Sequence, residues 1–241
     1  MNLVNISEPD KKKSTNILCL GIDFGTTNSV CSVKIDGKII YIEDSKKKLI
    51  PSIVFFKNQK VYIGNQIKNS SISELIFSVK RFFTDNPDQI IFSQGSNKKT
   101  AIDISKEIFS YIKNLSQDYL KQTIDDCVLT VPAYFDEKAR SGIMRAAFLA
   151  GFNVRRLINE PTAAAFAYGL EKKKRGLFLV YDLGGGTFDV SILELKEGIF
   201  RVLGTGGNSK LGGDDLDFLF AESILKKYFS VNLNEVDNDL K

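Results

Sequence analysis

The sequence predicts an α/β protein made of two similar lobes that face one another, each a β-meander followed by helices. The main observation is a repeat in which a strand, a turn containing threonine, a strand, a glycine hairpin and a third strand occur twice in the same order. The carboxylates at the two turns, Asp23 and Asp182, are 159 residues apart (182 minus 23). The hairpin glycines, Gly37 and Gly198, are 161 apart (198 minus 37). This matched spacing indicates a duplicated unit.

The first repeat opens a series of short β-prone segments. Strands are predicted at residues 17–24, 29–35, 38–43, 53–56 and 61–63, with a hairpin signal at Asp36-Gly37. Helical periodicity is predicted to begin near Ser71. Residues 1–15 are polar and lack periodicity, which predicts a flexible leader.

The middle of the chain alternates helices with short strands, of which the one at 127–131 is of the buried type. Apolar residues recur every three or four positions over 105–121, which predicts an amphipathic helix. Residues 127–131 and 154–158 are predicted strands. Between them a helix should begin near Asp136 and end near Gly151, and a further helix should follow Pro161 at 162–170.

The second repeat contains predicted strands at 177–182, 188–195 and 199–203, with a turn at Glu197-Gly198. Gly212 and Gly213 then precede a helix that Asp214 and Asp215 should cap.

Composition excludes several classes of function. The chain has no histidine, which rules out hydrolysis with a histidine base and histidine-ligated metals. The net charge is only +4, and the lysine runs at 11–13, 46–48 and 172–174 lack interleaved aromatics, so no nucleic-acid surface is expected. There is no apolar stretch of about 18 residues and no secretory segment, and the three cysteines indicate neither zinc nor a disulfide framework. We therefore expect a cytoplasmic protein without membrane contact.

The glycine turn within residues 182–189 is the strongest functional signal. Gly184, Gly185 and Gly186 let backbone N–H groups approach an anion, since no Cβ stands in the way. Asp182 and Asp189 flank the turn, where they could hold a hydrated divalent cation. The pattern favours a phosphate-and-metal loop, with a glycine-rich hairpin that binds nothing as the alternative.

Two charged residues have both a functional and a structural interpretation. Lys80 is either a cation at a terminal phosphate or attacking water, or a surface lysine with a buried stem. Glu160 either takes part in the chemistry or simply complements the dipole of the helix that it precedes. Hydrolysis of a phosphoanhydride needs a placed water, a divalent ion and donors for the developing charge. The two turns supply amides, and hydroxyls come from Thr26, Thr27 and Thr187.

Together these motifs resemble the nucleotide-binding domain of the Hsp70 chaperone family, which has the actin/hexokinase-like (ribonuclease H-like) ATPase fold. The resemblance covers nearly all of residues 17–228 in the expected order. Its motifs are 21–29 (GIDFGTTNS), 131–135 (VPAYF), 159–165 (NEPTAAA), 182–189 (DLGGGTFD) and 211–215 (LGGDD). Residues 6–9 and 205–209 look most like the HscA-type branch. That branch implies a role in iron–sulfur protein maturation, with an HscB-type J-domain cochaperone and an iron–sulfur scaffold protein as client.

The resemblance also implies ATP or ADP with Mg²⁺ as ligands and a role for each matched residue. Catalytic roles fall to Lys80, Glu160, Asp182, Thr187 and Asp189. Asp23 and Asp182 would hold Mg²⁺ through water. Nucleotide contacts fall to Gly25, Thr26, Thr27, Asn28, Gly184, Gly185, Gly186, Thr187, Gly212 and Gly213. Pro132 and Arg140 would relay the nucleotide state to a client-binding domain, and the J-domain surface would lie partly on the lobe that contains residues 204–217.

The sequence departs from the family pattern in two places. Only about twenty residues separate Phe83 from Ile104 (104 minus 83), so the small subdomain, about 38–104, is expected to be shortened. The expected organisation is a leader at 1–15, a first lobe at 16–172 and the start of a second lobe at 173–241. The second lobe would be incomplete and a client-binding domain absent. Without an adenosine pocket, the free energy of nucleotide binding should be weaker by several kcal/mol than in a complete domain.

Three functions remain open. The first is an ATP-hydrolysing chaperone domain that assists iron–sulfur proteins, with turnover impaired by truncation. The second is a non-catalytic remnant or interaction fragment that keeps J-domain contact without ATP turnover. The third is a sugar kinase or an actin-like filament protein, against which residues 159–165 and 211–215 speak.

Overall fold

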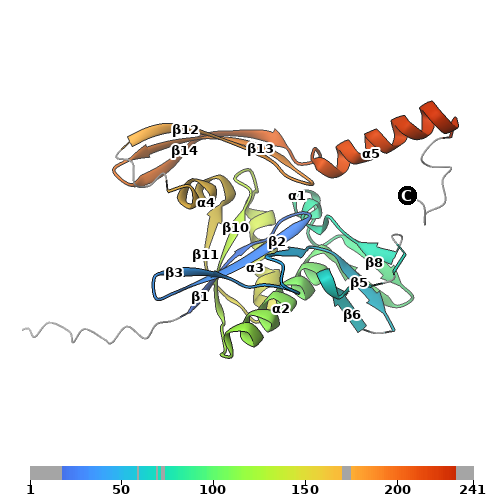
Figure 1. Ribbon diagram of the computed structural model, residues 1–241, viewed down its shortest axis with the longest axis horizontal. Coiled ribbons are helices and arrows are strands. Elements are labelled where there is room, and N and C mark those ends of the chain that lie inside the picture. The colour runs from blue at the N-terminus through green and yellow to red at the C-terminus, as the bar shows by residue number, and fades with distance from the viewer. Residues whose placement is uncertain (1–17, 59, 69, 72–73, 170–174, 232–241) are drawn as a thin grey trace, which may run out of the picture.

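A computed structural model describes residues 18–58, 60–68, 70–71, 74–169 and 175–231. We call residues 18–169 the first part and residues 175–231 the second part; the second lies across one side of the first (Figure 1). The predicted leader, the segment at 6–9 and the lysine runs at 11–13 and 172–174 lie outside the described residues. No helix among the described residues is long and apolar enough to cross a membrane.

The first part is built on a six-stranded mixed sheet. Its strands are β1 (Cys19–Asp23), β2 (Asn28–Ile35), β3 (Lys38–Tyr41), β4 (Leu49–Pro51), β10 (Asp126–Val131) and β11 (Asn153–Asn159). The order is β11-β10-β1-β2-β3, with β4 also pairing with β2. The pairs β1–β10 and β10–β11 are parallel, whereas β1–β2, β2–β3 and β2–β4 are antiparallel. The predicted meander and the strands predicted at 127–131 and 154–158 are confirmed, and β10 is mostly buried as expected, whereas β11 is not.

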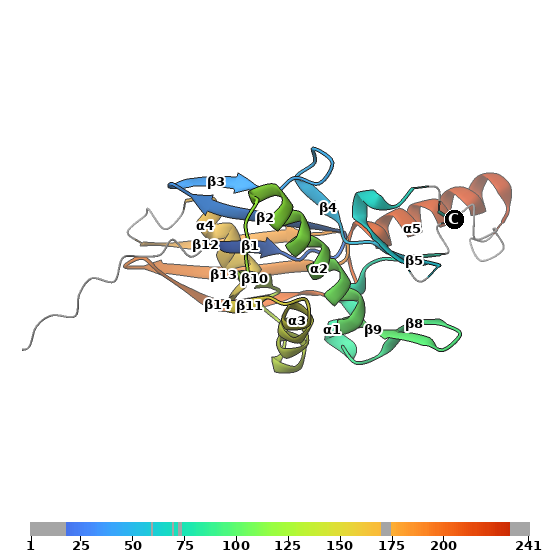
Figure 2. The ribbon, with the colours of Figure 1, turned by 90° about the horizontal axis from the view of Figure 1, so that it is seen from below.

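Two helices cover one face of this sheet, α2 (Ala101–Leu120) and α3 (Glu137–Leu149) (Figure 2). The apolar stripe of α2 becomes the core, because Ile104, Ile108 and Ile112 are fully buried. Asp136 caps α3 by accepting a 2.8 Å hydrogen bond from the backbone N–H of Ala139, and Gly151 follows α3 with φ +84°. The helix boundaries predicted from these caps are confirmed.

The region in which the sequence places the small subdomain contains two further sheets. One pairs β5 (Val54–Lys57) with β6 (Lys60–Ile63) and β7 (Leu75–Ile76), and the other is the hairpin of β8 (Ile90–Gln94) and β9 (Asn97–Thr100). Short helical turns are η1 (Gly64–Gln66), η3 (Val79–Arg81) and α1 (Phe82–Asp85). The helical segment predicted to begin near Ser71 is therefore interrupted by the strand β7, and helical turns follow this strand at 79–85. Leu75 and Ile76 instead pair with Phe55 and Val54, a contact that local periodicity cannot show.

The second part repeats the meander. β12 (Arg175–Leu183), β13 (Phe188–Lys196) and β14 (Ile199–Asn208) form a three-stranded antiparallel sheet. The hairpin turns of the two parts share one backbone conformation, since Asp36 and Gly37 have φ of 48° and 78° and Glu197 and Gly198 have 53° and 78°. The duplication predicted from spacing is confirmed. β14 is longer than predicted and runs on to Asn208.

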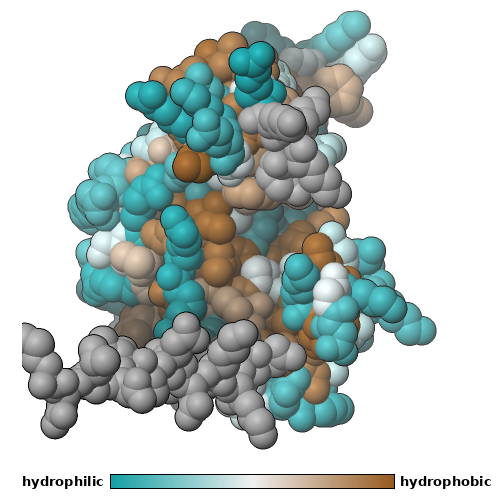
Figure 3. Space-filling view, turned by 90° about the vertical axis from the view of Figure 1, so that its left-hand side faces the viewer, coloured by the Kyte–Doolittle hydropathy of each residue, from teal (hydrophilic) through white to brown (hydrophobic). Residues whose placement is uncertain are grey.

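The two parts meet across α4 (Glu160–Ala167), which lies under the second sheet (Figure 1). The Phe166 ring meets the Phe200 ring edge-on at 5.0 Å. In Figure 3 apolar side chains gather between the second sheet, at the top, and the first part below it. The other face of β12 is open, with Leu177, Leu179 and Tyr181 each about two-thirds exposed. α5 (Gly213–Ile224), followed by the π-helical turn η5 (Leu225–Phe229), extends away from the body (Figure 1).

Candidate functional site

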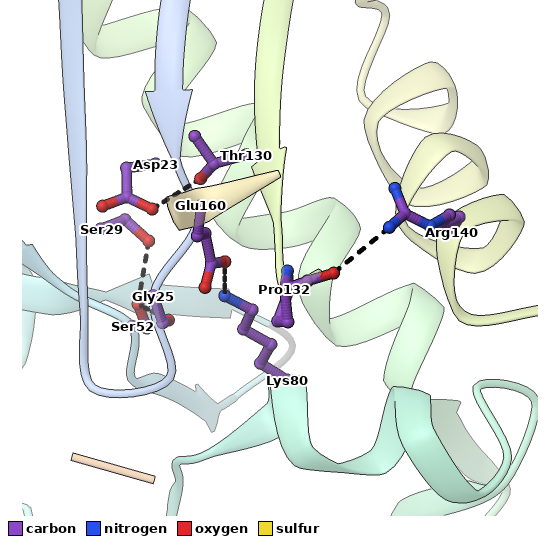
Figure 4. A network of polar contacts seen from close by, with 9 residues as sticks. All are labelled: Asp23, Gly25, Ser29, Ser52, Lys80, Thr130, Pro132, Arg140 and Glu160. Atoms are coloured by element: carbon purple, nitrogen blue, oxygen red, sulfur yellow. Dashed lines mark hydrogen bonds and ion pairs between the residues drawn. The ribbon is translucent and has the colours of Figure 1, made fainter. Parts of the chain in front are cut away.

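The turn between β1 and β2 is held by a buried serine from another segment. The Ser52 hydroxyl donates to the Gly25 carbonyl at 2.9 Å, and the Ser52 N–H donates to the Thr27 carbonyl at 2.8 Å. The hydroxyls of Ser29 and Ser52 are 2.9 Å apart (Figure 4). These contacts occupy the carbonyls of Gly25 and Thr27 and so fix the turn.

The turn between β12 and β13 is held by the start of α5. The Gly213 N–H donates to the Gly184 carbonyl at 2.9 Å, and the Asp214 N–H donates to the Gly185 carbonyl at 2.8 Å. The Gly184 N–H also donates a hydrogen bond to the Thr187 carbonyl at 2.9 Å, which closes the turn. The glycines predicted at 184–186 and 212–213 therefore form one local structure, although more than twenty residues separate them in the sequence.

The two turns pack directly against one another, which explains why the second turn needs glycine. A Cβ on Gly185 would collide with the Thr27 side chain, and one on Gly186 would collide with the Thr26 side chain. Only glycine permits such a close approach. The structure thus brings together the two phosphate-loop candidates that the sequence places 159 residues apart, with Gly25 and Asn28 flanking the contact on the first turn.

Lys80 and Glu160 form a buried ion pair. The Nζ of Lys80, on η3, donates to the Oε1 of Glu160, the first residue of α4, at 2.5 Å (Figure 4). The two side chains are only 6% and 15% exposed. Burial raises the pKa of Glu160, Lys80 opposes that rise, and the charges of Asp23 and Asp189 add to it. The interpretation of Lys80 as a surface lysine is therefore wrong, because its ammonium lies inside the protein beside a cluster of carboxylates.

Asp23, Asp182 and Asp189 contribute the other acidic groups. The Thr130 hydroxyl donates to Oδ1 of Asp23 at 2.6 Å, and Asp182 pairs with Asp189 across β12 and β13. Burial raises the pKa of Asp189 to about 6, and the Asp182 charge contributes to the rise, whereas a hydrogen bond with Thr187 and the Lys80 charge oppose it. Carboxylates that raise one another's pKa are stabilised by a bound cation.

These carboxylates suit a hydrated rather than a directly ligated metal. Among the described residues, no three acidic or cysteine side chains gather closely enough to coordinate an ion themselves. Mg²⁺ prefers oxygen ligands and usually keeps several of its waters. The donor set, all carboxylate oxygens around two turns, fits Mg²⁺ held through water by Asp23 and Asp182.

Pro132 and Arg140 are joined by a compact network next to the site. Arg140 donates from Nε to the Phe135 carbonyl at 2.8 Å, and from Nη2 to the carbonyls of Pro132 and Ala133 at 3.4 and 3.3 Å (Figure 4). The same Nη2 reaches Oδ1 of Asn159 at 2.8 Å. Asn159 immediately precedes Glu160, so this loop is connected to the Lys80–Glu160 pair.

Sequence reasoning missed five residues that shape the site. Ser52 and Thr130 position the first turn and Asp23, Tyr134 lies near two of the carboxylates, and Arg81 and Asp215 join the two parts. Burial, together with the charges of Asp189 and Glu160, raises the pKa of Tyr134. Arg81 adjoins Lys80, and Tyr134 and Asp215 lie in the motifs at 131–135 and 211–215, whereas Ser52 and Thr130 carried no signal in the sequence.

A cavity of about 440 Å³ opens beside the two turns. It is lined by polar groups from both parts and by apolar side chains: Thr27, Ile53, Phe77, Ser78, Arg81, Asp214, Asp215 and Phe218. A second cavity, of about 300 Å³, lies where Leu18, Asp126 and Asn153 meet and touches none of the predicted site residues. The first cavity is therefore the one that belongs to the candidate site.

This duplicated arrangement is the actin/hexokinase-like ATPase fold. A model of the Hsp70 protein family matches residues 19–240. The chain is 41% identical over 245 residues to a chaperone protein HscA homolog of Rickettsia felis, and 42% identical over 245 residues to that of Rickettsia prowazekii. It is 44% identical over 252 residues to chaperone protein HscA of Buchnera aphidicola subsp. Schizaphis graminum. The chain belongs to the Hsp70 family.

The matches cover unequal shares of the two chains. Each of these three takes in 95% of this chain, but only 38% of the Rickettsia felis relative and 41% of the other two. The chain thus spans about two fifths of the length of the curated relatives that it matches.

Proposed function

We propose that this chain binds MgATP and MgADP between its two turns and hydrolyses ATP, as part of an HscA-type chaperone that assists the maturation of iron–sulfur proteins. The observation that carries the proposal is the contact of the first turn, Gly25–Asn28, with the second, Gly184–Gly186, beside the buried Lys80–Glu160 pair. Two amide-bearing turns, a fixed ammonium and a carboxylate cluster are the groups that phosphoryl transfer to water requires.

Each residue has a part in this proposal. Backbone N–H groups of the turns and the hydroxyls of Thr26, Thr27 and Thr187 bind phosphate oxygens. Asp23 and Asp182 would hold a bound Mg²⁺ through its waters, and the ion would supply neutralisation of the phosphate charge. The ammonium of Lys80 lies at the terminal phosphate, where it stabilises the developing charge. Glu160 orients Lys80, and Asp189, with its pKa near 6, accepts a hydrogen bond from the attacking water.

The remaining roles rest on the same family membership. Gly212 and Gly213 hold the second turn against the nucleotide, and Pro132 with Arg140 relays its state to a client-binding domain. The partners are an HscB-type J-domain cochaperone and an iron–sulfur scaffold protein, and the compartment is the cytoplasm. The mature assembly contacts neither nucleic acid nor membrane.

Titration with MgATP, followed by single-turnover hydrolysis, tests the proposal. The purified chain should bind MgATP, and a Lys80→Met variant should still bind it but release phosphate at least about 100-fold more slowly. A charge-removing change of the exposed Lys98 on the β8–β9 hairpin is the control and should leave both quantities unchanged. Absence of MgATP binding would refute the proposal.

Adding a J-domain separates the two open functions. Faster phosphate release with the J-domain supports the chaperone ATPase. Binding of the J-domain without any phosphate release, in the presence or absence of ATP, supports the interaction fragment instead.

A further inference from the structure

Arg81 has a position that the proposed roles do not explain. It follows Lys80 directly on η3, and its side chain, 22% exposed, extends from the first part to the second. Its two terminal nitrogens form a bidentate ion pair with Asp215, in which Nη1 donates to Oδ1 at 3.1 Å and Nη2 donates to Oδ2 at 2.5 Å. The pairing with Arg81 holds the pKa of Asp215 below its usual value, so this carboxylate stays charged.

The third nitrogen of the same guanidinium is unsatisfied. Within the described part of the chain, Nε of Arg81 is buried and has no hydrogen-bond acceptor. A Cβ built on Gly186 would lie 2.8 Å from it, so Nε faces the second turn. A buried, charged donor without a partner costs free energy, and an anion at this place would supply the missing acceptor.

Asp215 connects Arg81 to the backbone of the second turn. Its Oδ2 also accepts a 2.8 Å hydrogen bond from the Gly212 N–H, and the residues that follow, Gly213 and Asp214, donate to the carbonyls of Gly184 and Gly185. The Ser78 hydroxyl, one turn before Arg81, donates to Asp214 at 3.0 Å. All of these groups lie at the 440 Å³ cavity or on the turn next to it.

We propose that Arg81 is a phosphate-binding residue that also draws the two parts together: its Nε donates to a phosphate oxygen while its terminal nitrogens remain on Asp215. A phosphate held in this way is bound by both turns and by a side chain that bridges them. The Arg81–Asp215 pair then transmits phosphate binding to the closure of the cavity, while Nε of Arg81 supplies the contact with the phosphate itself. The inference rests on the proposed function, because it assumes that the two turns bind phosphate.

A purely structural ion pair would behave differently. It would stabilise the contact between the parts whether or not an anion is present, and a lysine would replace much of its effect. A phosphate-binding arginine requires the planar guanidinium, since lysine cannot contact Asp215 with two nitrogens and present a third donor to the anion.

Calorimetric titration with Mg²⁺ and pyrophosphate tests the first half of the proposal on the full chain. Relative to the unchanged chain, Arg81→Gln should weaken pyrophosphate binding by about tenfold or more, which is the usual effect of losing one charged hydrogen bond. Arg81→Lys should weaken it by at least about threefold. The control is Lys210→Gln, which removes another ion pair between the parts, an exposed one with Asp85 at 3.4 Å, and should leave the affinity unchanged.

A single tryptophan tests the second half. The chain contains no tryptophan, so Phe218→Trp places one reporter in the cavity wall. Its emission should shift to shorter wavelength when Mg²⁺ and pyrophosphate are added, as the cavity closes. Adding Asp215→Asn should keep pyrophosphate affinity within about threefold, because Nε remains, but should abolish the shift.

The outcomes separate the two proposals. If the unchanged chain binds no pyrophosphate, both the proposed function and this inference fail. If it binds pyrophosphate and either Arg81 variant binds it equally well, only the inference fails. A tryptophan shift that survives Asp215→Asn also overturns the inference, since closure would then not depend on the ion pair.

Discussion

The ammonium of Lys80 lies 2.5 Å from the carboxylate of Glu160, although the two residues are 80 positions apart in the chain. Lys80 comes from a single 3₁₀ turn of the small subdomain, and Glu160 from the first turn of α4 below the second sheet. Both charges are buried, so neither is stable without the other. The pair therefore fixes the position of the small subdomain relative to α4.

Removing the lysine should destabilise the chain as well as stop hydrolysis. Lys80→Met leaves Glu160 buried without a cation and should lower the free energy of unfolding by about 3 kcal/mol. Urea denaturation measures this change. The double variant Lys80→Met/Glu160→Gln should regain most of the loss, because no charge stays buried. A double variant no more stable than Lys80→Met alone would contradict a role for the unpaired charge.

Asp189 predicts a pH dependence of stability in the metal-free protein. Its folded-state pKa, about 6, lies above the ordinary 3.8, so the folded chain binds this proton more tightly than the unfolded chain. The stabilisation is fully present below pH 3.8 and is lost as the pH rises through 6. In EDTA, Asp189→Asn should therefore raise the free energy of unfolding by about 1 kcal/mol at pH 8, a value that allows for solvent screening. At pH 4 it should leave the free energy of unfolding unchanged. Urea denaturation at the two pH values measures the gain, and an equal gain at both would contradict the assignment.

Replacement by alanine should destabilise the chain at one glycine of the second turn and leave its stability almost unchanged at another. Gly185→Ala drives a Cβ into the Thr27 side chain and should cost about 2 kcal/mol of unfolding free energy. Gly184→Ala is the matched control, because its Cβ would have an ordinary 3.5 Å contact with the Thr187 carbonyl. It should change stability by less than about 0.5 kcal/mol. Thermal and urea unfolding of the two variants measure the difference, and similar losses would show that the turns are not in contact in solution.

Arg140 should stabilise the loop after β10. Arg140→Met removes hydrogen bonds to three backbone carbonyls and to Asn159, and should lower the free energy of unfolding by about 2–3 kcal/mol. Lys138→Met, an exposed change on the same helix, should alter it by less than about 0.5 kcal/mol. Chemical denaturation compares the two variants. An Arg140→Met loss no larger than that of Lys138→Met would mean that the network adds nothing to stability.

The parts of the structure that were predictable are those with local signals. The hairpins at Gly37 and Gly198, the cap at Asp136 and the glycine after α3 each follow from a few neighbouring residues. The failures have non-local causes. Leu75 and Ile76 form a strand because β5 is available as a partner, and nothing in their own neighbourhood shows it.

The same distinction applies to the candidate site. Its glycines and aspartates were found because each turn has a sequence pattern of its own. Ser52 and Thr130 have none, because their importance comes only from the carbonyls and the carboxylate that folding brings to them. The Arg81–Asp215 pair joins residues 134 positions apart, and their sequence neighbours gave only their location, not their contact.

α5 contacts the rest of the described chain through its beginning. None of its twelve residues is buried, and its described contacts with the body come from residues 212–218 at its beginning. At 1.5 Å per residue the helix is about 18 Å long. Because of this length, a small rotation at the second turn would displace the far end of the helix, at Ile224, by several ångströms.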